Sequence, residues 1–285
     1  MNKSTLIALS SKRYQLQTMS TISCISLSGG IGKTTTCYLL SLILGRLGHK
    51  VLLLDCDPQS SLTFYIGVEF EDDDPTLLEV ITKEVEIEDA IYKSQFENVW
   101  IIPSDDGLNN AQQYLATSGT GATILNKRLK SVRDRFDFIL IDSPPQRSQI
   151  SLSTIGASDK IVIPFGTSSK GVNSVLRSLE LIWVQIENDV FEGEILGLLP
   201  FFDAWFGLNQ SKVCRESIQT VKDILIQETR TRLQNILIFP SARQSEQYKK
   251  AMDLSTTPRQ LNYEELNYPF EYIIDLLTDT KNKYD

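Results

Sequence analysis

The most constraining feature of the chain is a glycine-rich segment that follows a strand-like apolar run and opens a helical pattern, Ser28-Gly29-Gly30-Ile31-Gly32-Lys33-Thr34-Thr35. This order of strand, glycine loop and helix is the context that a phosphate-binding loop requires. The glycines let backbone N–H groups surround a phosphate, and the helix N-terminus adds the positive end of its dipole. In such a loop Lys33 reaches the β- and γ-phosphates, and the Thr34 hydroxyl binds Mg²⁺. The segment therefore predicts a site for a nucleoside triphosphate with Mg²⁺.

Apolar strand-like runs alternate with helical patterns along the rest of the chain. We predict strands at Ile22–Leu27, Val51–Asp55, Trp100–Ile102, Phe138–Asp142, Lys160–Pro164, Ile195–Leu199 and Ile236–Phe239. We predict helices at 34–47, 107–116, 124–134, 171–187, 211–227 and 263–285. Because the strands are continuously apolar, both faces of their sheet must be covered. The alternation predicts an α/β fold, a doubly wound and mostly parallel sheet with helices on both faces.

Three aspartates lie where two of these strands end. Asp55 and Asp57 belong to the segment Asp55-Cys56-Asp57-Pro58-Gln59, and Asp142 opens the segment Asp142-Ser143-Pro144-Pro145. Ligands of such sheets bind beyond the carboxyl ends of the strands. A carboxylate there can hold Mg²⁺ through water, and a second one near the γ-phosphate can orient the attacking water. The two segments therefore predict one site shared with the phosphate loop.

Composition argues against several classes of protein. The chain has no apolar run of about 18 residues, which argues against a transmembrane helix. Its cysteines form no CxxC pair, which disfavours structural zinc and an iron–sulfur carrier and fits a reduced cytoplasmic compartment. In segment 263–285 acids outnumber bases, whereas a membrane-surface helix carries Lys and Arg. We therefore expect no membrane partner.

The net charge of −8 originates in one segment. Residues 66–97 hold eleven acids and two bases, so that the remaining chain carries +1. Residues 201–252 hold eight bases and five acids. The acidic balance of the whole chain therefore does not exclude an anionic partner on another part of the surface.

At these motifs the sequence resembles the ParA/MinD family of deviant Walker ATPases, over nearly the whole chain after residue 20. The phosphate loop is similar to the family's deviant Walker A motif. Val51–Gln59 is similar to its Walker A′ segment, and Phe136–Pro145 to its Walker B motif. Ile102-Pro103-Ser104 resembles a segment in the middle of the ParA fold, and Ile238-Phe239-Pro240 resembles the late loop that packs beside the adenine.

The resemblance implies that the nucleotide is ATP and assigns roles to individual residues. Asp57 is implied as the residue that orients the attacking water. Asp55 and Asp142 are implied near Mg²⁺, and Pro240 beside the base.

One position departs from the family pattern. The family carries a signature lysine immediately before the two glycines, which reaches the partner's phosphates in an ATP-sandwiched dimer. Here this position is Ser28, which is similar to the carboxysome-positioning branch of the family. Losing a cation that acts across a dimer typically costs ~10³–10⁵ in the rate of phosphoryl transfer. Either hydrolysis is nearly absent, or another cation has taken the role.

Lys170 is the candidate for that replacement. It follows the predicted strand Lys160–Pro164 and a short loop that leaves the carboxyl edge of the sheet, the edge of the phosphate site. The alternative is that Lys170 is an exposed residue without a function at a helix N-terminus, where a cation is mildly unfavourable.

The resemblance also implies a cycle of ATP-dependent dimerisation, DNA binding and release. Family members of the ParA type form a homodimer with ATP and bind nucleoid DNA without sequence preference. They are released when a small adaptor or stimulator protein, which links them to cargo, triggers slow hydrolysis. We therefore expect a cytoplasmic, nucleoid-associated protein that distributes carboxysomes.

Such DNA binding requires a basic surface. Lys212, Arg215 and Lys222, at helical spacings of three and seven, are candidates, as are Arg230 and Arg232. The alternative is a solvated helix face without a partner.

Other functions remain open at this point. A plasmid or chromosome partition protein would differ in cargo only. A small-molecule ATP-dependent enzyme on the same fold would need a substrate pocket with its own ionisable cluster, and none is clearly marked.

Trp205 and Phe206 would either stack on adenine or pack at the dimer interface. We expect residues 1–18 to be a mobile extension and residues 19–285 to form a single ATPase domain.

Overall fold

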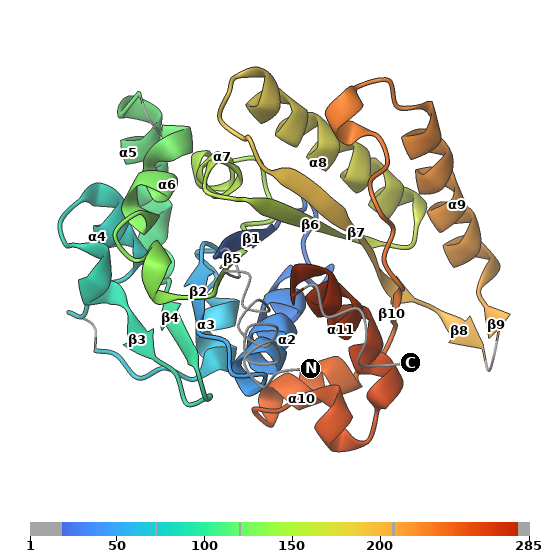
Figure 1. The fold of residues 1–285 in the computed structure, drawn as a ribbon, viewed down its shortest axis with the longest axis horizontal. Helices are drawn as coiled ribbons and strands as arrows, with labels where there is room; N and C mark the ends of the chain where they lie inside the picture. Colours follow the sequence, from blue (N-terminus) through green and yellow to red (C-terminus); the bar gives the residue numbers. More distant parts are fainter. Residues whose placement is uncertain (1–18, 72, 120, 207–208, 279–285) are drawn as a thin grey trace, which may run out of the picture.

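An eight-stranded sheet is the centre of the fold (Figure 1). The computed structural model describes residues 19–278 except 72, 120 and 207–208. The strand order is β10-β7-β6-β1-β5-β2-β4-β3, and all neighbours are parallel except β3 and β4. The strands are β1 (Ser20–Cys24), β2 (Val51–Asp55), β3 (Tyr92–Lys93), β4 (Val99–Ile102), β5 (Phe138–Asp142), β6 (Lys160–Gly166), β7 (Glu194–Asp203) and β10 (Ala242–Arg243). The predicted doubly wound, mostly parallel sheet is confirmed.

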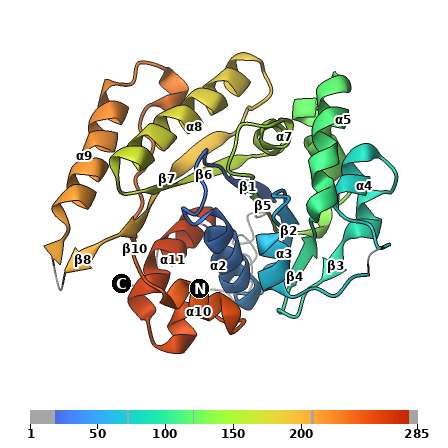
Figure 2. The same cartoon turned by 180° about the vertical axis from the view of Figure 1, so that it is seen from behind.

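Helices cover both faces of this sheet (Figures 1 and 2). One face packs against α2 (Lys33–Arg46), α3 (Ser61–Ile66), α10 (Gln247–Asp253) and α11 (Glu264–Thr278). The other packs against α4 (Leu77–Thr82), α5 (Ala111–Thr117), α6 (Ile124–Leu129), α7 (Gln149–Gly156), α8 (Ser169–Glu187) and α9 (Lys212–Gln227). A hairpin of β8 (Trp205–Phe206) and β9 (Asn209–Gln210) joins β7 to α9. Short 3₁₀ turns lie at Ile87–Ala90, Asp106–Asn110, Gly121–Thr123, Arg133–Arg135, Thr231–Leu233 and Pro258–Leu261.

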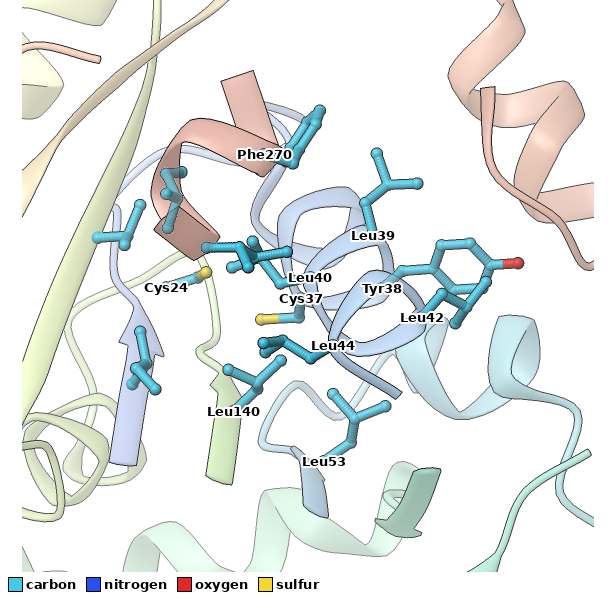
Figure 3. Close-up of a cluster of buried hydrophobic side chains, with 14 of the residues drawn as sticks. Cys24, Cys37, Tyr38, Leu39, Leu40, Leu42, Leu44, Leu53, Leu140 and Phe270 are labelled. Atoms are coloured by element: carbon cyan, nitrogen blue, oxygen red, sulfur yellow. The ribbon is translucent and has the colours of Figure 1, made fainter. Parts of the chain in front are cut away.

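Helix α2 is held on almost all sides, which explains why its sequence is apolar nearly all round. Leu44 lies near Leu140 of β5 and Leu53 of β2, and Leu40 and, toward the top of the view, Phe270 of α11 belong to the same buried cluster (Figure 3). Each of these five side chains is at most 1% exposed. Because α2 begins at the phosphate loop, this packing fixes the loop relative to the sheet.

The strand predicted at Ile236–Phe239 is not formed. A single bridge joins Ile238 to Leu198 of β7, and the edge strand β10 begins only at Ala242. Pro240 lies between them and has no N–H to donate, so the ladder is interrupted.

Other boundaries differ more modestly from the predictions. The helix expected at 124–134 ends at Leu129, and the one expected at 107–116 begins as a 3₁₀ turn. The C-terminal helix is confirmed over Glu264–Thr278. The expectation for residues 1–18 lies outside the described residues.

The strand register brings the predicted motifs to one edge. Asp142 of β5 lies opposite Asp55 of β2 on one side and Cys24 of β1 on the other. The phosphate loop and both acidic segments therefore emerge side by side. None of the described helices has the length and apolar character needed to cross a membrane.

Candidate active site

The phosphate loop lines a cavity of about 510 Å³. Gly30 and Gly32 have φ of +67° and +88°, in the left-handed region that favours glycine. A Cβ on Gly32 would lie 2.4 Å from the Phe201 ring, so that ring closes over the loop. The cavity is lined by Gly29, Gly30, Ile31, Gly32, Lys33, Thr34, Thr35, Asp57, Gln59, Ser61, Tyr65, Pro145, Phe201, Phe202, Ser245, Tyr248, Lys249 and Met252. The structure thus brings residues 29–35 of the predicted loop and Asp57 together around one cavity.

Lys33 lies folded over the loop that precedes it. Its side chain is largely buried, and its Nζ donates to the Ser28 carbonyl oxygen at 3.0 Å. Burial lowers the pKa of Lys33, while the Asp142 and Asp57 carboxylates raise it. The ammonium group therefore binds the backbone of the phosphate loop and is attracted by the carboxylates of both acidic segments.

Thr34 and Asp142 form the part of the site that fits a metal ion. The Thr34 hydroxyl donates to Asp142 Oδ2 at 2.6 Å. Asp142 Oδ1 is buried and has no hydrogen-bond partner in the described part of the chain. An unused carboxylate oxygen beside a threonine hydroxyl suits Mg²⁺, which takes oxygen ligands and keeps several waters. These residues would hold Mg²⁺, which neutralises charge on the β- and γ-phosphates when it is bound.

Asp55 holds the segment that follows β2, and its predicted place near Mg²⁺ stays a prediction. Its Oδ1 accepts from the Asp57 amide at 3.1 Å, and its Oδ2 accepts from the Thr63 amide and hydroxyl, both at 2.9 Å. Both oxygens are therefore occupied by the segment that follows β2. No sequence pattern indicated the short helix α3 that supplies Thr63, so this arrangement was missed.

The buried Asp142 carboxyl should make Mg²⁺ binding depend on pH. Burial and the nearby Asp55 carboxylate raise the pKa of Asp142 to about 8, against the opposing effects of Thr34 and Lys33. Because Mg²⁺ binds the ionised form, Mg²⁺-dependent ATP binding should release a proton and tighten as pH rises from 6 to 8, by up to about tenfold per unit. Calorimetry in buffers of different ionisation enthalpy measures this release.

Asp142→Asn is the control. This variant cannot release a proton at position 142, so any release that remains comes from ATP itself. Without nucleotide, the stability of the folded protein has the opposite pH dependence. The folded state then holds a proton that the unfolded chain loses above pH about 4, so the free energy of unfolding falls as pH rises toward about 8. Equal Mg²⁺ affinity at pH 6 and pH 8 would contradict the assignment of Asp142 to the metal.

Lys170 lies beside the phosphate loop, as the sequence predicted. It is exposed in the first turn of α8 and lines a second cavity, of about 440 Å³, together with Ser28 and Gly29. Within the described residues it forms no ion pair. Its position is compatible with a role at the phosphates, and that role stays a prediction.

Pro240 does not line the nucleotide cavity. It lines another cavity, of about 300 Å³, together with Lys222 and Tyr272. The cavity residues that come from β7 and α10 are instead largely aromatic. They were missed because only the fold brings these segments, more than 150 residues along the chain, to the loop: Phe201, Phe202, Tyr248, Lys249 and Met252.

Trp205 likewise contacts residues outside the nucleotide cavity. Its Nε1 donates to Asp203 at 2.9 Å, and the Arg243 guanidinium lies 4.4 Å from its ring centroid. The Phe206 side chain lies outside the described part. Trp205 does not line the nucleotide cavity, which leaves the expectation of adenine stacking unsupported.

The basic residues divide into two groups. Lys212, Arg215 and Lys222 are exposed on α9, and Lys212 lies 3.6 Å from Glu216. Arg230 instead pairs with Glu228 at 2.7 Å and with Glu180 at 2.9 Å.

Arg232 is engaged in the same internal way as Arg230. Its guanidinium donates to the carbonyl oxygens of Phe191, Glu192 and Gly193. The ion pairs of Arg230 offset its charge, whereas the partners of Arg232 are neutral carbonyl groups, and DNA contact by these two residues stays a prediction.

Comparison with known proteins agrees with this site. An AAA domain family model matches residues 19–191. Maintenance of carboxysome distribution protein A (McdA) of Synechococcus elongatus is 44% identical, over 91% of this chain and 99% of that protein. The ATP complex of a Cyanothece McdA variant is 45% identical with a TM-score of 0.87, over 94% of this chain and 99% of that one. The cell division ATPase MinD of Pyrococcus furiosus shares the fold, with a TM-score of 0.67 at 23% identity over 90% and 99%.

The parallel sheet, the deviant phosphate loop and the Thr34–Asp142 pair define an ATPase of the P-loop class. The chain belongs to the ParA/MinD family of ATPases and, within that family, to the McdA proteins.

Proposed function

We propose that this protein is a positioning ATPase that distributes carboxysomes. In this proposal it forms an ATP-sandwiched homodimer, binds nucleoid DNA without sequence preference, and is released when an adaptor protein stimulates hydrolysis. The observation that carries the proposal is one cavity that joins the phosphate loop, Lys33 and Asp57, in a chain whose relatives are named for carboxysome distribution.

The roles of the residues follow from their places around that cavity. The loop N–H groups and Lys33 bind the phosphates, and Thr34 with Asp142 holds Mg²⁺. Asp57 orients the attacking water, and Lys170 supplies the cation that Ser28 cannot. Slow hydrolysis then acts as a timer for DNA release.

The exposed face of α9 is the proposed DNA surface. Lys212, Arg215 and Lys222 are solvent-exposed, and only Lys212 has an ion-pair partner among the described residues. Each phosphate that a cation neutralises steepens the fall in affinity as salt rises. Dimerisation would double the number of such cations on one DNA molecule.

Binding to non-specific duplex DNA tests the proposal. We expect binding with ATP, and none with ADP or without nucleotide, weakening steeply between 50 and 200 mM salt. The variant Lys212→Gln/Arg215→Gln/Lys222→Gln should lose at least about tenfold in affinity and show a shallower salt dependence. A matched control, Lys83→Gln/Lys127→Gln/Lys130→Gln, removes the same charge from the opposite end of the molecule (Figure 1) and should bind normally.

Two results would redirect the proposal. Retained ATP binding without DNA binding under any condition would exclude DNA-based positioning and favour a small-molecule enzyme. Loss of plasmids, with carboxysomes still evenly spaced in cells that lack the gene, would favour partition as the cargo system. Carboxysome spacing in those cells, seen by fluorescence microscopy, therefore identifies the cargo.

A further inference from the structure

The turn that carries Asp57 depends on contacts from outside itself. Asp57 follows β2 and is only half-buried. Its carbonyl oxygen accepts from the Ser60 amide at 2.9 Å, and its carboxylate accepts from the Gln59 amide at 3.1 Å. Ser60 has a φ of +54°, a left-handed conformation that costs a non-glycine residue roughly 1 kcal/mol. A turn with such an unfavourable residue needs support to keep one conformation.

Ser104 provides one of these supports. Its hydroxyl donates to the Asp57 carbonyl oxygen at 3.0 Å, and the side chain is almost completely buried. Ser104 lies just after β4, the strand that pairs with β2, and 47 positions separate the two residues. The motif Ile102-Pro103-Ser104 thus reaches the site from a neighbouring strand.

Ser104 is itself fixed on both sides. Its amide donates to the Thr63 hydroxyl at 3.0 Å, and that hydroxyl donates to Asp55 Oδ2. The preceding residue, Pro103, accepts from the Leu77 amide at 2.9 Å, which ties the loop to the start of α4. The Ser104 hydroxyl is therefore held in place when it meets Asp57.

These contacts form a closed ring around the Asp57 backbone. Its N–H is held by Asp55 Oδ1, and its C=O is held by Ser104. Thr63 links Asp55 to Ser104, so the same network fixes both sides of the residue. Ser104 provides the contact to the Asp57 carbonyl that comes from outside the turn, so its loss leaves that carbonyl only the Ser60 amide and loosens the backbone of Asp57.

We propose that Ser104 is a positioning residue for ATP hydrolysis. Its hydroxyl fixes the backbone of Asp57, and thereby aims the Asp57 carboxylate at the phosphate loop. This proposal rests on the proposed role of Asp57 in orienting water. A displacement of about 1 Å in a catalytic group can cost about 100-fold in rate, so the chemical step is where the loss should appear.

Single-turnover ATP hydrolysis of Ser104→Ala tests the proposal, with affinity for a fluorescent ATP analogue measured in parallel. We expect the hydrolysis rate to fall about 10- to 100-fold, with ATP affinity changed less than about twofold. Ser104→Thr retains the hydroxyl and should recover most of the rate. The matched control is Ser94→Ala, because Ser94 is also buried and donates to a backbone carbonyl, of Val99 at 2.8 Å, away from the cavity.

Variants of Asp57 separate failure of this inference from failure of the proposed function. If Asp57→Ala hydrolyses ATP normally, the proposed role of Asp57 is wrong. If Asp57→Ala is inactive but Ser104→Ala is fully active, the positioning role of Ser104 is wrong. In the Asp57→Ala background, Ser104→Ala should cause no further loss, because both act on one step.

A second variant covers the case in which Ser104→Ala does not fold. Thr63→Val keeps the size of the side chain but removes the hydroxyl that holds the Ser104 amide. It should reproduce the loss in hydrolysis rate with ATP affinity retained. Wild-type hydrolysis by Thr63→Val would overturn the proposed network.

Discussion

Lys170→Ala should lower the rate of ATP hydrolysis by ~10³ or more while ATP still binds. Lys170 is an exposed cation without an ion-pair partner among the described residues, and it lines a cavity with Ser28, the position where the family carries its signature lysine. A cation that reaches the transferred phosphoryl group stabilises the charge of the transition state, so its loss affects the chemical step. Phosphate release under saturating ATP and DNA measures the effect.

Mixing two inactive variants decides whether Lys170 acts across the dimer. Lys33→Ala keeps Lys170 but has a defective phosphate loop, whereas Lys170→Ala has the reverse defect. If Lys170 acts in trans, a mixture of the two regains part of the wild-type rate, because one site of each mixed dimer is complete. If it acts on its own phosphate loop, the mixture stays inactive. Normal hydrolysis by Lys170→Ala alone would refute any catalytic role.

Lys33→Ala should weaken ATP binding about 100-fold and abolish ATP-dependent DNA binding. Each charge-assisted hydrogen bond to a phosphate contributes about 1.5–3 kcal/mol, and Lys33 is largely buried at the loop, where water screens it poorly. The substitution also removes the cation that lowers the pKa of Asp142, so Mg²⁺ binding should shift to higher pH. Titration with a fluorescent ATP analogue, with and without Mg²⁺, measures both effects.

Lys249→Ala is the matched control for Lys33→Ala. Lys249 lines the same cavity but is exposed, so solvent screens its charge and we expect a loss of less than about tenfold. Equal losses in the two variants would contradict the assignment of Lys33 to the phosphates. They would indicate that affinity depends only on the net charge of the cavity.

The sequence by itself determined the fold class and the phosphate loop. Both depend on local patterns: apolar runs predict buried strands, and a glycine loop between strand and helix requires little beyond its own residues. The doubly wound order then implied that Asp55, Asp57 and Asp142 lie at one sheet edge, and the β2–β5 register places Asp55 opposite Asp142.

Only the tertiary structure decided which partner each side chain meets. Asp55 binds Thr63, Arg230 pairs with Glu180, and Ser104 reaches Asp57, in contacts that no local pattern indicated. Most of the aromatic residues that line the nucleotide cavity likewise come from β7 and α10, far along the chain from the loop. The spacing of apolar residues along the sequence indicates which face of one helix or strand is buried. Hydrogen bonds and ion pairs between side chains depend instead on which elements become neighbours, and tertiary packing decides that.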